Sequence, residues 1–370
     1  MSDYFPHQNS YGILDETASG NDTGLATARR IENARLLQLL DPQPSRWLLE
    51  VVCETGSTNA DLATQLKKAR GIPFEPSVRV AYSQTAGRGR RGRPWLATPN
   101  NALLFSLGHL MPRSPDQLAG LSLALSATIV DGLRTLPLDD SGRLSLKWPN
   151  DILLDGAKLA GVLVETAWST RDATALVVGV GLNINGTHEL QQQIALLDET
   201  PCTTLPIIVS TLSFAWPNAA LTPVLSAVLN ALAIGLDRFS QHGFEPFRDI
   251  WIAGHAYAGQ EVVVLEQGNE IARGIAYDVN KQGQLLIYTP QEVRVISTGD
   301  VSLRLAANFD TSTSSGRTNE LLTASGSGVA LYLSRLPTDG LLAFDTSLSG
   351  ASKRPAAGCA CEQQLRNDNT

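Results

Sequence analysis

Four short apolar segments follow one another in the middle of the chain with very little sequence between them. The segments are 144–148, 151–154, 159–167 and 175–183. The connections between them are Pro149-Asn150, Asp155-Gly156 and the polar stretch 169–172. Segments of this length and composition are typical of β-strands. Because parallel strands need crossovers of a dozen or more residues, turns this short predict antiparallel pairing.

Other strands and helices flank this group. Strands are expected at 47–53, 78–83 and 101–110, and helices at 23–40, 58–70 and 223–240. Ser114, Pro115 and Gln117 have the spacing of a helix start, and leucines and one isoleucine recur at helical intervals from Leu118 to Leu133. This predicts an α+β fold, in which helices cover one face of a mixed, mainly antiparallel sheet.

The 370 residues exceed the length of a usual single domain. We expect a disordered arm and short helix over 1–45 and a larger α+β domain over 46–256, in which 185–218 is irregular. Short alternating strands at 261–265, 271–278, 284–288 and 293–297 predict a small β-domain over 257–305. The Ser-, Thr- and Gly-rich remainder, 306–370, is expected to be disordered.

Composition excludes several functions. The 29 Lys and Arg against 36 Asp and Glu give a formal charge of −7, which argues against general DNA binding through the phosphate backbone. The four cysteines are too few for a disulfide framework. The N-terminus has no export signal, and the apolar stretches are too short or interrupted to cross a membrane. We expect a soluble, cytoplasmic protein.

An arginine-rich loop is the most unusual segment. Residues 87–93 read GRGRRGR, which formally matches a dinucleotide-binding glycine motif through Gly87, Gly89 and Gly92. That interpretation fails because Pro94 and Pro99 leave no helix start behind the glycines to receive a pyrophosphate. Guanidinium groups and exposed backbone N–H groups suit a polyanion such as a nucleotide triphosphate. A solvated basic loop or a nucleic-acid arm is the alternative.

Three further motifs are individually weak. They are KWPND at 147–151, KLAGVLVE at 158–165 and VGVGLNIN at 178–185. A lysine such as Lys158 at the start of an apolar strand needs a carboxylate or phosphate partner to stay charged, although snorkelling or a structural role is the commoner explanation. Glycines within a strand allow close approach of a ligand, but they also mark simple bulges.

Taken together and in this order, these motifs resemble the biotin protein ligases over about 250 residues, from Trp47 to Leu305. The resemblance also uses Ser57-Thr58-Asn59 and Gln84. It implies a class II synthetase-like catalytic domain followed by an SH3-like barrel. No winged-helix repressor domain is expected, because only 46 residues precede Trp47.

The resemblance also implies roles for individual residues. Those expected to bind biotin are Ser57, Thr58, Asn59, Gln84, Gly87, Arg88, Gly89, Arg90, Lys158 and Gly161. Those expected to bind ATP are Arg90, Arg93, Trp95, Lys147, Asn150 and Asn183. Those expected to be catalytic are Lys158, Arg90, Arg88 and Lys147. No metal site made of protein ligands is expected.

The implied reaction has two steps. Biotin and ATP form biotinyl-5'-AMP with Mg²⁺, and a lysine of the biotin carboxyl carrier protein of acetyl-CoA carboxylase then displaces AMP. The enzyme is expected to be a monomer or homodimer that acts on neither DNA nor membranes. Two alternatives stay open at this point: a lipoate-type ligase of the same fold, and a nucleic-acid binder that uses only the arginine loop.

Overall fold

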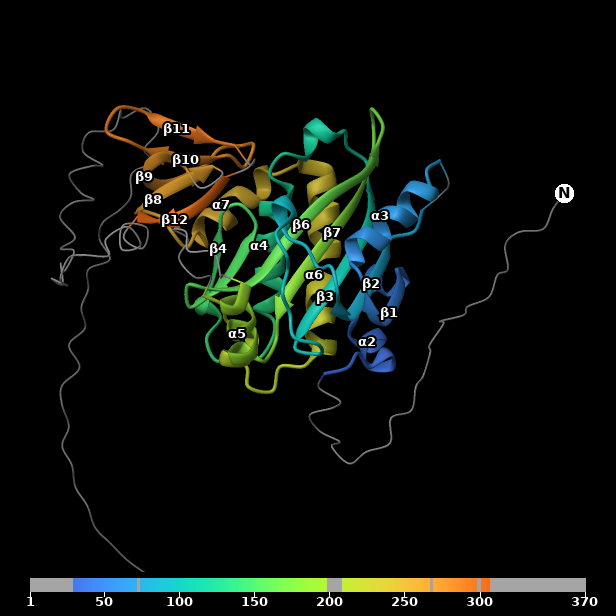
Figure 1. The fold of residues 1–370 in the computed structure, drawn as a ribbon. Coiled ribbons are helices and arrows are strands. Elements are labelled where there is room, and N and C mark those ends of the chain that lie inside the picture. The colour runs from blue at the N-terminus through green and yellow to red at the C-terminus, as the bar shows by residue number, and fades with distance from the viewer. Residues whose placement is uncertain (1–28, 72–73, 198–207, 267–268, 298–300, 307–370) are drawn as a thin grey trace, which may run out of the picture. The chain divides into compact units, whose positions relative to one another are not determined.

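A seven-stranded sheet is the larger of two sheets in the computed structural model, which describes residues 29–71, 74–197, 208–266, 269–297 and 301–306. The sheet order is β1-β2-β3-β7-β6-β5-β4 (Figure 1). The strands are β1 (Leu48–Thr55), β2 (Ser77–Gln84), β3 (Ala102–Met111), β4 (Leu144–Lys147), β5 (Asp151–Leu154), β6 (Ala157–Ser169) and β7 (Thr174–Asn183). Only β1 and β2 pair in parallel. The predicted mixed, mainly antiparallel sheet is therefore confirmed.

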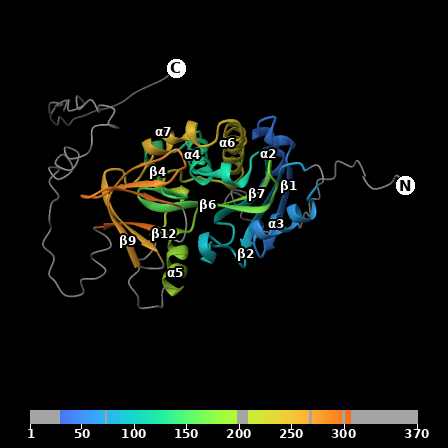
Figure 2. The same ribbon diagram turned by 90° about the horizontal axis from the view of Figure 1, so that it is seen from above.

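Alternate residues of β7 face two different layers. Leu176, Val178 and Val180 belong to the main core, which they share with helices α4 (Leu121–Leu133) and α6 (Leu221–His242). Ala175 and Val177 instead pack with helix α3 (Thr58–Lys68). Figure 2 shows α4, α6 and α7 (Glu245–Ala253) above the sheet and α3 below it. The helices predicted on one face are there, and α3 covers part of the opposite face.

Two predicted helices differ in extent from those observed. The helix expected at 23–40 appears as α2 (Asn33–Leu39), and 23–28 lie outside the described residues. The helix expected from Ser114 is interrupted, because Gly120 adopts φ +80° between a 3₁₀ turn at Pro115–Leu118 and α4. The capping box at Ser114 and Gln117 is present, but it starts the short turn.

The segment predicted to be irregular, 185–218, contains helix α5 (Thr187–Leu197), so that prediction was wrong for these residues. The remaining short 3₁₀ turns are Pro44–Arg46, Arg90–Gly92, Ser141–Arg143 and Leu212–Phe214. Helix α6 has 22 residues, and an 18-residue window within it has a mean hydropathy of 1.2, which meets the length and composition of a membrane span. Because 61% of that window is buried within the protein, α6 is a core helix.

A second sheet follows α7, in the order β11-β10-β9-β8-β12. Its strands are β8 (Gln260–Glu266), β9 (Asn269–Val279), β10 (Leu285–Tyr288), β11 (Val293–Ile296) and β12 (Val301–Leu305). All pairings are antiparallel, and β12 is a strand that the sequence did not predict. The tail was predicted to be disordered over 306–370, and all of it except Ala306 lies outside the described residues, as does the start of the predicted N-terminal arm, 1–22.

Candidate active site

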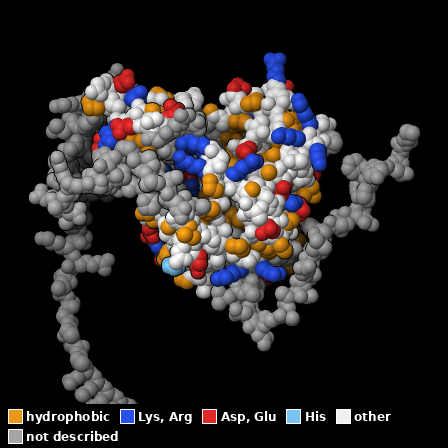
Figure 3. Space-filling view, in the orientation of Figure 1, with side chains coloured by type: hydrophobic (Ala, Val, Ile, Leu, Met, Phe, Trp, Pro, Cys, Tyr) orange, Lys and Arg blue, Asp and Glu red, His pale blue; other side chains and the backbone are white. Residues whose placement is uncertain are grey.

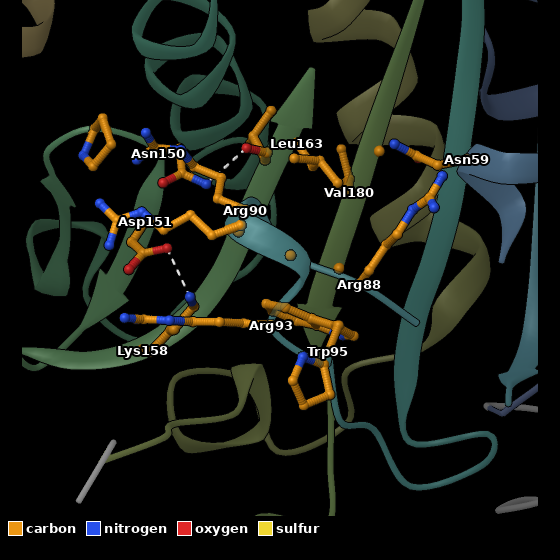
Figure 4. A pocket seen from close by; sticks show the side chains of 18 of the residues that line it. Asn59, Arg88, Arg90, Arg93, Trp95, Asn150, Asp151, Lys158, Leu163 and Val180 are labelled. Atoms are coloured by element: carbon orange, nitrogen blue, oxygen red, sulfur yellow. Dashed lines mark hydrogen bonds and ion pairs between the residues drawn. The ribbon is translucent and has the colours of Figure 1, made fainter. Parts of the chain in front are cut away.

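Strand register sets a row of residues across the face of the large sheet that carries α3. Lys147 of β4 lies opposite Asp151 of β5, and Asp151 lies opposite Gly161 of β6. Gly161 in turn lies opposite Gly181 of β7. The row therefore runs from two charged side chains to a glycine floor made of Gly161 and Gly181, and all four residues line one pocket. Figure 4 shows this pocket, with Asp151 labelled.

One end of the pocket is cationic. Lys158 Nζ lies 2.7 Å from Asp151 Oδ1, and both side chains are mostly buried. Lys147 and Arg93 line the same region, together with Arg304 from β12 of the second sheet. These four cations outnumber the carboxylate of Asp151, so this end is suited to a ligand that carries several negative charges. Figure 3 shows Lys and Arg side chains gathered near the middle of one face of the molecule.

The crowding of positive charge changes the titration of these groups. Burial, and then the charge of Arg304, lowers the pKa of Lys147 from 10.5 to about 8. Burial and then Arg93 also lower the pKa of Arg304. Burial would raise the pKa of Asp151, but the charges of Lys158 and Lys147 outweigh it and hold this pKa below its ordinary value. A bound polyanion would relieve the repulsion among the cations.

Trp95 lies directly on the glycine floor. A Cβ atom at Gly181 would lie 2.3 Å from the indole, and one at Gly161 would lie 3.0 Å from it. Lys158 Nζ is 5.3 Å from the centre of the ring, within the range of a cation–π contact. The indole Nε1 is buried and has no hydrogen-bond partner among the described residues. The two glycines are therefore required by the close approach of this ring.

The other end of the pocket has a wall of uncharged polar side chains, with Arg88 beside it. The Thr58 backbone N–H donates to Gln84 Oε1 at 2.8 Å, and the Thr58 hydroxyl donates to the same oxygen at 3.2 Å. Since Oε1 is occupied, the amide nitrogen of Gln84 is directed away from these donors and is available to a ligand. Ser57 precedes α3 as its N-cap residue, yet its hydroxyl makes no capping bond.

The arginine loop closes on itself as a narrow ribbon. Gly89 N–H donates to the Arg93 carbonyl at 2.8 Å, and Trp95 N–H donates to the Gly87 carbonyl at 2.8 Å. At its tip Arg91 adopts φ 63°, a left-handed conformation that costs about 1 kcal/mol for a residue other than glycine. A Cβ atom at Gly87 would lie 2.8 Å from the Trp95 carbonyl, so glycine is needed where the two strands of the ribbon meet.

The pocket brings together most of the residues that the sequence pointed to. Those that line it are Ser57, Thr58, Asn59, Gln84, Arg88, Gly89, Arg90, Arg93, Trp95, Lys147, Asn150, Lys158 and Gly161. Gly87 stays at the base of the loop. Asn183 is buried outside the pocket lining, and its amide donates to the Ser210 carbonyl at 3.2 Å. Asn183 therefore supports the backbone beside Lys158, whose carbonyl accepts from Ser210 N–H.

Three charged residues of the pocket were absent from the predicted set: Arg91, which belongs to the arginine loop, Asp151 and Arg304. Asp151 is the last residue of the KWPND motif, and a carboxylate at the start of an apolar strand was an available signal. Arg304 lies in the strand that the sequence did not reveal, and nothing local connects it with residues 147–158. Its approach to the pocket depends on the packing of the second sheet.

Family comparisons agree with this architecture. Residues 52–183 match the model of the biotin/lipoate A/B protein ligase family, and residues 257–304 match the biotin protein ligase C-terminal domain. The fold and the pocket therefore define a member of this class of ligases.

Individual relatives narrow the class. The biotin--[acetyl-CoA-carboxylase] ligase of Mycobacterium tuberculosis is 34% identical over 256 residues, covering 68% of this chain and 88% of that protein. The Paracoccus denitrificans enzyme of the same name is 32% identical, covering 68% of this chain and 98% of that protein. The Aquifex aeolicus biotin protein ligase, solved with biotin and ATP, has a TM-score of 0.54 and 28% identity, covering 70% of this chain and 99% of that one. The chain belongs to the biotin protein ligase family.

Proposed function

We propose that this protein is an ATP-dependent biotin protein ligase that forms biotinyl-5'-AMP and transfers the biotinyl group to a lysine of a carrier protein. The observation that carries the proposal is one pocket with two chemically different ends. The neutral end around Ser57, Thr58 and Gln84 offers hydroxyl and amide groups, and the other end is cationic. Biotin has the matching parts, a neutral ureido ring and a carboxylate, and ATP is a polyanion.

In the first half-reaction, an oxygen of the biotin carboxylate attacks the α-phosphorus of ATP, and pyrophosphate leaves. Both reactants are anions, so positioning and positive charge supply most of the rate enhancement. We assign Lys158 to the carboxylate and then to the acyl phosphate. Lys147, Arg93 and Arg304 are assigned to the phosphates, with Trp95 beside the nucleotide.

Magnesium is proposed to arrive with ATP as part of the substrate. Among the described residues there is no group of three or more His, Cys, Asp or Glu side chains that could hold a metal ion. The phosphate oxygens would supply most of its ligands, and Asp151 is the carboxylate within the pocket. The ion would neutralise phosphate charge during the displacement.

In the second half-reaction, the amine of the acceptor lysine attacks the carbonyl carbon of the mixed anhydride, AMP leaves, and the amine loses a proton. The arginine loop, residues 87–93, is assigned to covering the intermediate, because water would otherwise hydrolyse the anhydride. The proposed acceptor is the biotin carboxyl carrier protein of acetyl-CoA carboxylase, in keeping with the names of the relatives.

The test is incubation of the protein with radiolabelled biotin, ATP and a carrier domain, with and without magnesium. Label should enter the carrier only when ATP and magnesium are both present, and a carrier whose acceptor lysine is replaced should stay unlabelled. Competition with lipoate distinguishes the related ligase activity: lipoate should leave biotinyl adenylate formation unchanged. Absence of label with every component present would refute the proposal.

Several broader expectations accompany this function. We propose a division near residue 256, because the large sheet and its helices precede it and β8 begins at Gln260. We also propose a cytoplasmic enzyme, monomeric or homodimeric, that binds neither DNA nor membranes. The formal charge of −7 supports the absence of DNA binding, and a gel shift at moderate salt would test it.

A further inference from the structure

Glu165 of β6 lies just outside the pocket and bridges two residues that line it. Its Oε2 atom accepts a hydrogen bond from Asn59 Nδ2 at 2.7 Å. Its Oε1 atom lies 3.6 Å from Arg88 Nη2. The two oxygens of one carboxylate thus contact the polar end of the pocket and the arginine loop separately. Figure 4 shows Arg88 and Asn59 next to each other at this end.

The contact with Glu165 fixes the orientation of the Asn59 amide. An ionised carboxylate can only accept hydrogen bonds, so the amide must present Nδ2 to it. The Oδ1 atom then faces Ser106, whose hydroxyl donates to it and which is fully buried. A flipped amide would set two acceptors against each other. With only 4% of its surface exposed, Asn59 has no other orientation that satisfies these partners.

The same amide leaves no space on the sheet beneath it. A Cβ atom at Gly179 would lie 2.1 Å from Asn59 Oδ1, so this glycine allows the amide to lie against β7. Ser106 Oγ also lies 2.7 Å from Thr58 Oγ1, and the Thr58 backbone N–H donates to Gln84 Oε1 at 2.8 Å. A continuous polar chain therefore runs from Glu165 through Asn59, Ser106 and Thr58 to Gln84.

We propose that Glu165 is a positioning residue for biotin that couples binding in the polar end of the pocket to closure of the arginine loop. This inference rests on the proposed function. Through Asn59, Glu165 sets which amide atoms face the ureido group of biotin. Through Arg88, it holds the first arginine of the loop beside the same ligand. One carboxylate thus connects recognition of the ring with retention of the adenylate.

Two substitutions separate these contributions. In Glu165→Gln, the amide oxygen can still accept from Asn59, but the charge facing Arg88 is lost and an N–H group takes its place. Because Arg88 and Glu165 are both partly exposed, the expected effect is an escape of the adenylate about two- to fivefold faster, with little change in the biotin KM. Glu165→Ala also removes the partner of Asn59, and the biotin KM should rise about tenfold.

The experiment combines a double-mutant cycle with a matched control. Biotin KM and kcat for adenylate formation, the rate of adenylate escape and the thermal midpoint are measured for the parent, Glu165→Gln, Glu165→Ala, Arg88→Ala and Arg88→Ala/Glu165→Gln. The control is Glu50→Gln. It removes the ion pair between Glu50 and Arg79, which lies on the same sheet but outside the pocket lining. It should leave KM and escape unchanged.

The expected result is that Glu165→Gln accelerates escape in the parent background but has no further effect when Arg88 is already alanine. Equal acceleration in both backgrounds, or a parental biotin KM in Glu165→Ala, would overturn the inference. If Glu165→Ala does not fold, the cycle with Glu165→Gln still tests whether Glu165 controls adenylate escape through Arg88. A parent protein that forms no biotinyl adenylate would instead refute the proposed function and this inference with it.

Discussion

Replacing Lys147 by arginine should remove a pH dependence of ATP binding that the parent protein shows near pH 8. Burial and the neighbouring Arg304 lower the pKa of Lys147 from 10.5 to about 8. The charged form binds phosphate, so binding is strong below pH 8 and weakens above it. At pH 9 about a tenth of the lysine remains charged, which predicts an ATP KM about tenfold higher than at pH 7.

The same shift has a consequence for stability. The folded-state pKa lies below that of the unfolded chain, so between pH 8 and 10.5 the unfolded chain binds the extra proton. Stability should therefore rise with pH across this window, and the cost of the buried charge at neutral pH is about 3 kcal/mol. Bound ATP should offset part of this cost, which makes stabilisation by ATP larger at pH 7 than at pH 9.

The assay is the ATP dependence of biotin-stimulated pyrophosphate exchange from pH 7 to 9, with thermal unfolding in parallel. Arginine keeps its charge throughout this range, so Lys147→Arg should have a nearly constant ATP KM even if its value differs from that of the parent. Lys67→Arg, on the exposed surface of α3, is the control, and its ATP KM should rise between pH 7 and 9 as in the parent. A constant ATP KM in the parent from pH 7 to 9, or the same tenfold rise of the ATP KM in Lys147→Arg, would refute the reasoning.

Three further predictions follow from the pocket. Lys158→Ala should slow adenylate synthesis at least tenfold, about 1.4 kcal/mol, because the biotin carboxylate loses its cation; unchanged pyrophosphate release would remove Lys158 from the mechanism. Arg90→Ala should speed escape of the adenylate while the thermal midpoint stays constant, and parental retention on a filter would contradict this. Gly181→Ala places a Cβ atom 2.3 Å from the Trp95 indole and should displace the ring, raising the ATP KM and changing tryptophan fluorescence. Gly56→Ala, where a Cβ atom meets nothing within 4 Å, is its control, and an identical response of the two variants would show that the close approach has no consequence.

Local patterns in the sequence predicted most strands well and helix ends less well. The strands of the large sheet were found because short apolar segments and Pro or Gly turns are local signals. The helix from Ser114 was drawn too long, since Gly120 interrupts it despite the continuing leucine spacing. Helix α5 was missed although Leu190, Ile194 and Leu197 have helical spacing, because its glutamines and polar neighbours gave the segment the composition of a loop.

The candidate site was also predicted only in part. The motifs pointed to the arginine loop, Lys147 and Lys158, because these residues are unusual for their immediate surroundings. They did not name Arg304, which lies in β12, about 150 residues further along the chain than the KWPND motif. They also placed Asn183 with the nucleotide, whereas its amide bonds the Ser210 carbonyl outside the pocket lining. Whether it affects ATP binding through the backbone beside Lys158 remains a prediction.

The sequence by itself determined the fold class, the family and the chemical types available for the reaction, since each of these depends on residue identity and short-range spacing. Only the tertiary structure decided which residues meet. The alignment of Lys147, Asp151, Gly161 and Gly181 results from strand register, and a shift of one residue would turn each side chain to the opposite face. Register is fixed by side-chain packing summed over whole strands and layers, which no local window of sequence contains.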